Sequence, residues 1–259
     1  MRARAFTAVL SGTLTICAFG AAPAQASPIS PTTITAVAVN GGQPIVVGTA
    51  TKTISAAVVG TNDSGIGAGI VLLWHGAGDY AHRDATLADP NPGVCLSPGT
   101  LGYCTSTIGI TPARGTDRAL YSNSLAGTWK VATFMWGNNH QLGSSYQYST
   151  VRVLRQAKLS ADAAPEPAHA GQTINVSGKL VRADWETGAD AGYANQPVKL
   201  QFHKTGSTGF VTLKTVMTGS GGVLNTTVEV SANGSYRFAF AGDATTSAVQ
   251  SLEDVVNLD

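Results

Sequence analysis

One short sequence pattern occurs twice in this chain, and the distance between its copies restricts the fold more than any other feature. Residues 126–134 read AGTWKVATF, and residues 233–241 read NGSYRFAFA. Each copy has a glycine, a small hydroxyl residue, a large aromatic residue, a basic residue, an apolar residue and then alanine. The copies lie roughly 100 residues apart, which is about one β-sandwich domain. The pattern therefore predicts two similar sandwich domains in tandem.

Strand-like segments recur along the whole chain at the short spacing of a sandwich. Residues 33–39 (TITAVAV) and 198–202 (VKLQF) alternate in polarity, which is typical of a strand buried on one face. Residues 89–102 are the one weak candidate for a helix, and their prolines and glycines argue against it. The expected strands are 33–39, 44–47, 52–59, 69–74, 106–110, 119–122, 128–136 and 147–154, then 158–161, 172–180, 197–203, 210–217, 223–230, 235–241 and 249–258.

The N-terminal segment has the features of a secretion signal. Arg2 and Arg4 precede an apolar run over residues 5–22, and residues 24–26 (AQA) have the small-residue form of a cleavage site. A retained membrane helix is disfavoured, because the run is marginal against the ~20 apolar residues that span a bilayer. We expect cleavage after residue 26, a secreted, extracellular product, and no integral membrane span in that product.

The predicted domain organisation is a signal peptide over residues 1–26, a first sandwich over 27–156 and a second over 157–259. Charged residues make up only 12% of the chain, and the formal net charge is +1. Loss of two arginines with the signal leaves a charge near −1. Such a balance gives no long-range attraction to nucleic acid, so we expect no nucleic-acid partner.

Two cysteines remain in the predicted mature chain, because Cys17 lies within the signal. A lone, closely spaced pair in an oxidising compartment most simply forms a disulfide, here between Cys95 and Cys104. The aromatic residues of the repeated pattern, Trp129 and Tyr236, are predicted core anchors. In related sandwiches a tyrosine at this position sends its hydroxyl back to the preceding main chain, and an indole N–H would serve the same purpose.

The second half of the chain resembles a known class of domain. Residues 173–180 (TINVSGKL), 196–202 (QPVKLQF) and 236–242 are similar to bacterial Ig-like domains of secreted actinobacterial proteins. Residues 183–186 (ADWE) and 191–193 (AGY) resemble an uncharacterised secreted family from Streptomyces-like bacteria. The resemblance implies an all-β fold of two tandem Ig-like sandwiches and an extracellular location. It carries over no catalytic or binding residues.

No segment matches a catalytic motif, so the chain is not expected to be an enzyme. The local cluster of histidine and aspartate contains His75, Asp79, His82, Asp84 and Asp89. A structural zinc site needs four ligands in a closed set, and these residues follow one glycine-containing loop. We therefore interpret the cluster as a solvated loop.

Calcium is the one cofactor that the residues leave open, and similar proteins are loosely described as calcium-binding. Asp63 lies in one candidate loop, and Asp184, Glu186 and Asp190 lie in another. Neither loop matches an EF-hand, and Asp favours turns in any case. No cofactor is expected, with structural calcium as the alternative.

Loop aromatic residues are the candidates for ligand binding. Trp185 and Tyr193 lie in segment 182–196, which in a sandwich would face the first domain. Segment 75–104 is expected to leave the first domain at its C-terminal end, so the two segments could meet at the junction. In one interpretation Trp185 and Tyr193 pack at the domain junction against the disulfide-bonded segment. In the other, they form an exposed sugar-stacking platform together with Tyr80.

A third candidate region is segment 137–147, which contains His140 and Tyr146 and is expected at the free tip of the first domain. Its Tyr, Ser, Gly and Asn residues are typical of recognition loops. The predicted function is a secreted, non-catalytic binding or adhesion module whose partner is a cell-wall or environmental polysaccharide, or a protein. The alternatives are a structural spacer or surface-assembly protein, or a calcium-stabilised Ig-like protein. The sequence leaves the oligomeric state open.

Overall fold

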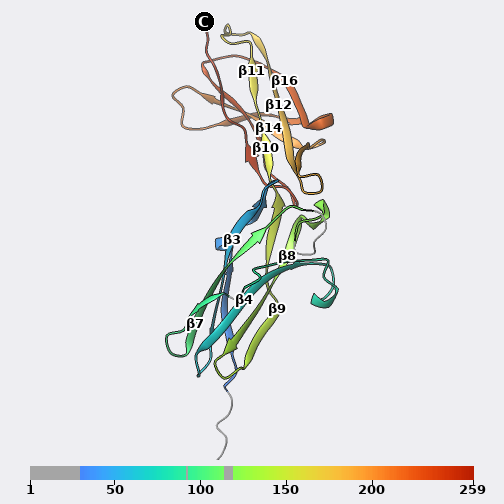
Figure 1. Cartoon of the computed structure of the whole chain (residues 1–259). Coiled ribbons are helices and arrows are strands. Elements are labelled where there is room, and N and C mark those ends of the chain that lie inside the picture. The colour runs from blue at the N-terminus through green and yellow to red at the C-terminus, as the bar shows by residue number, and fades with distance from the viewer. Residues whose placement is uncertain (1–29, 92, 114–118) are drawn as a thin grey trace, which may run out of the picture.

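The computed structural model describes residues 30–91, 93–113 and 119–259. The chain forms two β-sandwiches joined end to end, with the first half of the chain below and the C-terminus at the top of Figure 1. The described residues contain strands and four short 3-10 turns but no α-helix, so no helix among them could cross a membrane. The predicted signal peptide lies outside the described residues. The all-β, Ig-like fold class is confirmed.

The first sandwich has a four-stranded and a five-stranded sheet. The smaller sheet contains, in order, β1 (Thr33–Val39), β3 (Lys52–Thr61), β7 (Leu101–Ile110) and β6 (Val94–Leu96). The larger sheet contains, in order, β2 (Ile45–Val47), β9 (Leu142–Arg155), β8 (Gly127–Gly137), β4 (Ile66–His75) and β5 (Ala85–Ala88). The side chains between the two sheets form one hydrophobic core that includes Trp129 and Leu73.

The second sandwich has two five-stranded sheets. One contains β10 (Ala157–Leu159), β11 (Asp162–Ala164), β12 (Thr173–Asp184), β13 (Ala189–Gly192) and β16 (Val223–Glu229). The other contains β15 (Val211–Met217), β14 (Pro197–Lys204), β17 (Gly234–Phe240), β18 (Val249–Gln250) and β19 (Asp254–Val256). Its core is separate and includes Tyr236 and Phe238.

The two copies of the repeated pattern lie on strands inside their sheets. Strand β8 begins at Gly127 and β17 at Gly234. Trp129 is fully buried, and its indole N–H donates to the main-chain oxygen of Leu125 at 2.7 Å. Tyr236 is also buried and packs against Phe202, with ring centroids 4.8 Å apart. Its hydroxyl makes no hydrogen bond within the described part of the chain, and burial raises the pKa of Tyr236.

Several segments differ from the strands expected from sequence: β5 and β6 were not expected, and the expected strand 249–258 is divided into β18 and β19. Residues 119–122 are not a strand. They lead into the turn η3 (Asn123–Leu125), where the Ser122 side chain accepts a hydrogen bond from the Ser124 N–H. The expected loop over residues 182–196 is largely a hairpin, since β13 pairs with the last four residues of β12. This hairpin extends β12 toward the first sandwich.

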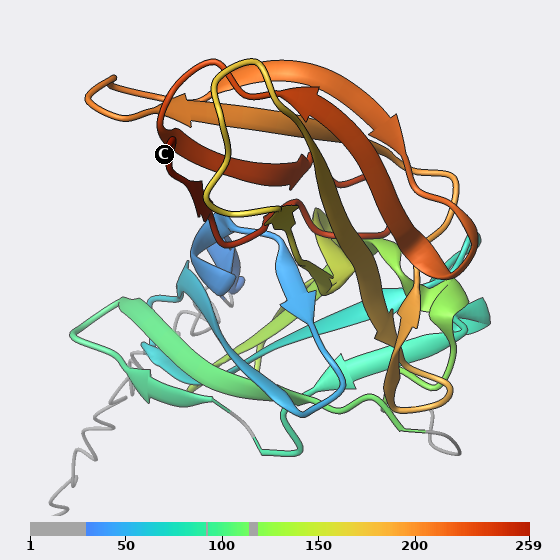
Figure 2. The same cartoon turned by 90° about the horizontal axis from the view of Figure 1, so that it is seen from above.

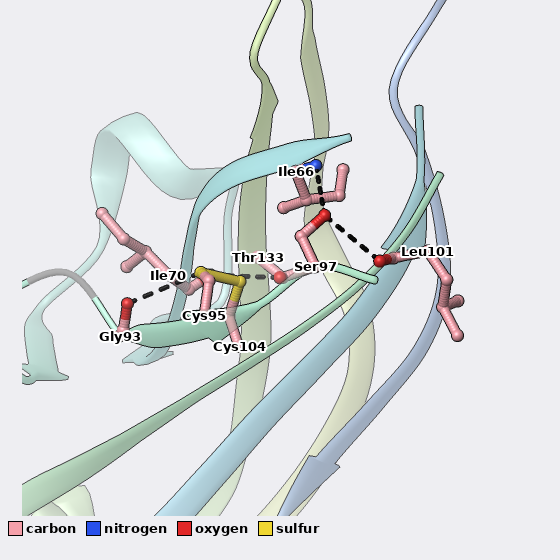
Figure 3. The surroundings of a disulfide bond; sticks show 8 residues. All are labelled: Ile66, Ile70, Gly93, Cys95, Ser97, Leu101, Cys104 and Thr133. Atoms are coloured by element: carbon pink, nitrogen blue, oxygen red, sulfur yellow. Dashed lines mark hydrogen bonds between the residues drawn. A yellow bond between two sulfur atoms is a disulfide. The ribbon is translucent and has the colours of Figure 1, made fainter. Parts of the chain in front are cut away.

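The predicted disulfide between Cys95 and Cys104 is confirmed, and it joins two neighbouring strands (Figure 3). The bond packs on Gly69 of β4, where a Cβ added to the glycine would lie 2.7 Å from the Cys104 sulfur, so only glycine fits at this position. Ser97 fixes the same hairpin to β4: its hydroxyl accepts from the Ile66 N–H at 2.8 Å and donates to the Leu101 oxygen at 3.2 Å. The hairpin is therefore held against the larger sheet at two points.

Trp185 crosses the domain boundary. It comes from the second half of the chain, yet it is 1% exposed and belongs to the hydrophobic core of the first sandwich. Its indole N–H donates to the Val47 oxygen at 3.3 Å. The expectation of Trp185 in an exposed platform is therefore wrong. Its expected packing on the disulfide-bonded hairpin is also wrong, because that hairpin lies beside Ile66 and Ile70, at the end of β4 remote from the junction.

Hydrogen bonds surround Trp185 and hold the two sandwiches together. Glu186 accepts from the Asn123 N–H and the Ser122 hydroxyl, each at 2.9 Å, and Asp184 accepts from the Asn123 side-chain amide at 3.0 Å. The side-chain amide oxygen of Asn123 in turn accepts from the main-chain N–H of Trp185 at 3.0 Å. These bonds place η3 of the first sandwich directly against the β12–β13 hairpin of the second, where the two halves overlap in Figure 2.

The strand that connects the sandwiches also belongs to both. Arg155 ends β9, and only Gln156 separates it from β10. The Arg155 N–H donates to Thr245 O at 2.9 Å, and its carbonyl accepts from the Ser247 N–H at 3.0 Å. Its Nε donates to Ala183 O at 2.6 Å, and burial lowers the pKa of this guanidinium. The junction is therefore hydrogen-bonded through main chain and side chains.

Candidate ligand-binding face

Aromatic rings gather on the outer face of the larger sheet of the first sandwich. Along β8, residues 129, 131, 133 and 135 are buried, whereas Phe134 and Trp136 are half-buried on the opposite, outward face. Tyr146 of β9 is 52% exposed. Trp74 of β4 and Tyr80 of the turn η2 (Tyr80–His82) complete the group. We call these five residues the aromatic row.

Each ring of the aromatic row contacts the next one in space, from Trp136 at one end to Trp74 at the other. Trp136 and Phe134 are nearly parallel, with an interplanar angle of 24° and centroids 6.4 Å apart. Phe134 meets Tyr146 edge-on at 5.3 Å, and Tyr146 meets Tyr80 at 5.1 Å. Tyr80 then meets Trp74 edge-on at 5.8 Å. These are the offset and edge-to-face arrangements that aromatic pairs favour.

One end of the row is fixed by polar contacts. Trp74 is only 1% exposed, and its indole N–H donates to Tyr146 O at 2.6 Å. The Lys130 ammonium lies 4.1 Å from the Trp74 ring centroid and donates to Gly76 O and Gly78 O, each at 2.9 Å. The guanidinium of Arg83 lies 4.1 Å from the Tyr80 ring centroid. Trp74 is thus a structural support. Tyr80 is half-buried like Phe134 and Trp136 and is held by Arg83 beside the accessible rings of Tyr146, Phe134 and Trp136.

The strand segments around the accessible rings are uncharged, whereas Asp79 and Arg83 lie beside Tyr80. Phe134 stands opposite Ile70 on β4 and Ser144 on β9, and Trp136 stands opposite Ala68 and Leu142. Residues 66–74 of β4, 131–137 of β8 and 142–151 of β9 contain no charged side chain. A pocket lined by Asp79, Tyr80, Ala81 and Tyr146 opens where the row meets η2. The face therefore offers ring surfaces, hydroxyl groups and one shallow pocket.

The structure brings some predicted ligand-binding residues together and separates the others. Tyr80 and Tyr146 are in contact, although they come from segments that lie far apart in the sequence. His140 is exposed in the β8–β9 turn at the free tip, with φ 62°, beyond the end of the row. Tyr193 is half-buried in the second sandwich, where the Arg182 guanidinium lies 3.7 Å from its ring centroid. It does not share a surface with Trp185, which is buried.

The hydroxyl of Tyr193 is also engaged, because it donates to Asp243 at 2.6 Å. Burial, together with this hydrogen bond, raises the pKa of Tyr193. Burial alone would raise the pKa of Asp243, but hydrogen bonds from Tyr193 and Thr245 outweigh it and lower that pKa. Tyr193 therefore contributes to the packing of the second sandwich and does not present a free ring.

Asp63 lies apart from the other three carboxylates considered for calcium, and those three have protein partners. Asp63 is exposed in the β3–β4 turn. Asp190 accepts from Lys158 at 2.6 Å on the surface of the second sandwich. The hydrogen bond from Asn123 lowers the pKa of Asp184, which also accepts from the main chain of the turn that follows. The described residues contain no cluster of three or more His, Cys, Asp or Glu that could hold a metal.

The histidine–aspartate cluster forms two surface pairs. His75 Nδ1 lies 2.9 Å from Asp84, and His82 Nδ1 lies 2.7 Å from Asp79. The bond from His82 lowers the pKa of Asp79, which accepts at the start of η2. Within the described residues, no Ser, Thr or Cys side chain is hydrogen-bonded to either histidine. These pairs fix the loop that carries Tyr80.

Trp74, Phe134 and Trp136 were not predicted from the sequence as parts of a surface. A signal was present: residues 128–136 carry large apolar side chains at both odd and even positions. A strand with one solvent-exposed face should alternate between apolar and polar residues. The apolar residues at even positions therefore indicate a second apolar face. The contact between Tyr80 and Tyr146 has no such local signal, because η2 folds across the sheet.

Comparisons with known proteins show no family for this chain. No protein-family model and no curated protein matches the chain. Among solved structures, dimeric latent PorU from Porphyromonas gingivalis is 12% identical with a TM-score of 0.30, and the match covers 92% of this chain but only 21% of that one. Fibronectin(III)-like modules of Clostridium thermocellum CbhA are 13% identical with a TM-score of 0.29, covering 85% of this chain and 92% of that one. The D00–D0 domain of intimin is 13% identical with a TM-score of 0.27, covering 85% and 99%. Likeness this low gives no argument about function.

Proposed function

We propose that the protein is a secreted, non-catalytic module that binds an extracellular polysaccharide on the aromatic row. The contiguous, partly exposed run of Tyr146, Phe134 and Trp136 carries this proposal. Aromatic rings present flat apolar surfaces, and the C–H-bearing faces of sugar rings are of similar size. Ser144, which stands opposite Phe134, supplies a hydroxyl that can hydrogen-bond to sugar hydroxyls, and the uncharged strands around Phe134 and Trp136 suit a neutral polymer.

Secretion is part of the same proposal. The sequence features of residues 1–26 support it, and so does the disulfide, because such bonds persist mainly in oxidising compartments. Membership of the secreted actinobacterial family stays a prediction from the resemblance in residues 173–202 and 236–242.

The test is retention on insoluble polymers. The chain expressed from residue 27 is incubated with peptidoglycan, chitin and cellulose, and bound and free fractions are measured. We expect retention on at least one polymer, weakened about 2- to 10-fold by Trp136→Ala or Tyr146→Ala, since a stacked aromatic contact is worth about 0.5–1.5 kcal/mol. Tyr148→Ala is the matched control, because Tyr148 lies on the same strand but outside the row. Retention on none of the polymers would refute the proposal.

The junction favours a second candidate function, a structural spacer. Trp185 is buried in the first core, and Arg155 is bonded to the main chain of the second sandwich. Such contacts suit a rod that holds its two ends at a fixed separation. A spacer without a binding face would show no retention on any polymer. The wild type and the Trp136→Ala variant would then behave alike in that assay.

A further inference from the structure

A small pocket opens at one end of the aromatic row, where the turn η2 meets strand β9. It is lined by Asp79, Tyr80, Ala81 and Tyr146, and its volume is about 330 Å³. Ligand pockets in proteins usually measure about 300–1,000 Å³, so this one lies at the small end of the range. Its size suits one substituent of a sugar ring better than a stack of several rings.

Most of the pocket wall is apolar. The rings of Tyr80 and Tyr146 have centroids 5.1 Å apart and planes inclined at 40°. The methyl group of Ala81 is exposed beside them. A ligand group with an apolar part gains free energy by covering these surfaces, because apolar area is then removed from water.

The charged group of the pocket is the Asp79 carboxylate. Its Oδ1 accepts from the His82 ring at 2.7 Å and from the His82 main-chain N–H at 3.1 Å. These bonds lower the pKa of Asp79, so the carboxylate is ionised at neutral pH and can only accept hydrogen bonds. A carboxylate has about four acceptor positions. Since this side chain is 70% exposed, it can also accept a hydrogen bond from a ligand.

The pocket is held in shape without a ligand. Arg83 donates to Tyr80 O at 2.7 Å and to the Thr86 hydroxyl at 2.9 Å, which fixes η2 to β5. On the other side of the pocket, Tyr146 O accepts from the Trp74 indole at 2.6 Å. A preorganised pocket loses little conformational entropy when it binds.

Building on the proposed polysaccharide-binding function, we propose that this pocket takes the N-acetyl group of a hexosamine, so that the polymer bound is an N-acetylated one. The acetamide N–H donates to Asp79, and the acetyl methyl packs against Ala81 and the two tyrosine rings. A plain hydroxyl would meet Asp79 but would leave the apolar wall uncovered.

Charge argues against the other common sugar substituents. Asp79 repels an anionic group such as a uronic acid carboxylate. The Arg83 guanidinium lies 4.1 Å from the Tyr80 ring centroid and offsets the attraction of Asp79 for a free amino group. The acetamide is neutral and has both an N–H donor and an apolar end, which are the two features that the pocket matches.

The place of the pocket agrees with a polymer that lies along the row. Tyr146 belongs to both, because it lines the pocket and meets Phe134 edge-on at 5.3 Å. Sugar rings stacked on Trp136 and Phe134 therefore continue toward the pocket, and one N-acetyl group enters it. The exposed rings bind the polymer, and the pocket selects among polymers.

Calorimetric titration with soluble oligomers tests this inference. The chain from residue 27 is titrated with chitohexaose and with cellohexaose, which share linkage and length and differ only in the substituent at carbon 2 of each ring. We expect chitohexaose to bind at least about tenfold more tightly, through the hydrogen bond to a carboxylate and the buried methyl group. The glucosamine hexamer, which lacks the acetyl groups, should lose this preference.

Two variants locate the preference in the pocket. Ala81→Leu fills the pocket, and Ala77→Leu is the matched control, because Ala77 is exposed on the same loop but does not line the pocket. Both positions are exposed, so both variants should fold normally. We expect Ala81→Leu to remove the preference for chitohexaose and Ala77→Leu to keep it. Asp79→Asn, which retains an oxygen for the start of η2, should reduce the preference.

Several results would overturn the inference. Equal binding of chitohexaose and cellohexaose would overturn it and leave the proposed function in place. Tighter binding of cellohexaose or of the glucosamine hexamer would overturn it too. A preference that Ala81→Leu leaves intact would show that the N-acetyl group binds elsewhere. If no hexamer binds, the inference is wrong, and retention on the insoluble polymers decides separately whether the proposed function stands. Where chitohexaose is preferred, retention on chitin against peptidoglycan distinguishes the two N-acetylated polymers.

Discussion

Replacing Trp185 by alanine should destabilise the first sandwich, although residue 185 belongs to the second half of the chain. The side chain is 1% exposed within the first core. Truncation of a buried tryptophan costs about 3–5 kcal/mol of unfolding free energy, through lost burial and the cavity that remains. The lost indole hydrogen bond adds little, because Val47 O also accepts from the Gln156 N–H at 2.9 Å.

The assay combines denaturant unfolding with amide hydrogen exchange of the full chain. We expect Trp185→Ala to speed exchange in β2 and β8 of the first sandwich. Phe238→Ala is the matched control, since Phe238 is fully buried in the second core and should affect that sandwich alone. If Trp185→Ala left exchange in the first sandwich unchanged, or cost less than about 1 kcal/mol, the packing argument would be refuted.

Two further predictions concern the junction carboxylates. The hydrogen bond from Asn123 lowers the folded pKa of Asp184 below its unfolded value of about 3.9. Its contribution to stability is therefore complete above that unfolded value and is lost as the pH falls through the folded pKa. Thermal unfolding from neutral pH downward should show a decline below about pH 4 that is smaller in Asp184→Asn, and equal slopes would contradict this. For calcium, Asp184 and Glu186 already accept hydrogen bonds across the junction, so EDTA should leave the unfolding temperature unchanged. A rise on adding calcium that Asp184→Asn abolishes would instead establish a calcium site.

The repeated pattern was sufficient to predict the fold class, because a glycine followed by a large aromatic residue has the same structural use in both halves. Trp129 and Tyr236 both lie at the third position of their strands and point into a core. Alternation along residues 33–39 likewise predicted β1. These inferences depend on local geometry, which the sequence carries directly.

The aromatic row could not be predicted in the same way. Tyr80 and Tyr146 meet because η2 folds back over β4 and because β9 has an irregular register opposite Ala132. Trp185 looked like a loop residue, and only the extension of β12 into the first sandwich buries it. Such contacts depend on how separate elements pack, and no short segment of sequence encodes them.

Hydroxyl-radical footprinting on a bound polymer would test the central claim most directly. Oxidation of aromatic side chains is measured by mass spectrometry, with and without the polymer that retains the chain. The binding face proposed here predicts protection of Tyr146, Phe134 and Trp136, with His140 unchanged. Protection at His140 with the three rings still fully reactive would show that the polysaccharide binds elsewhere, and would contradict the aromatic row as the binding face.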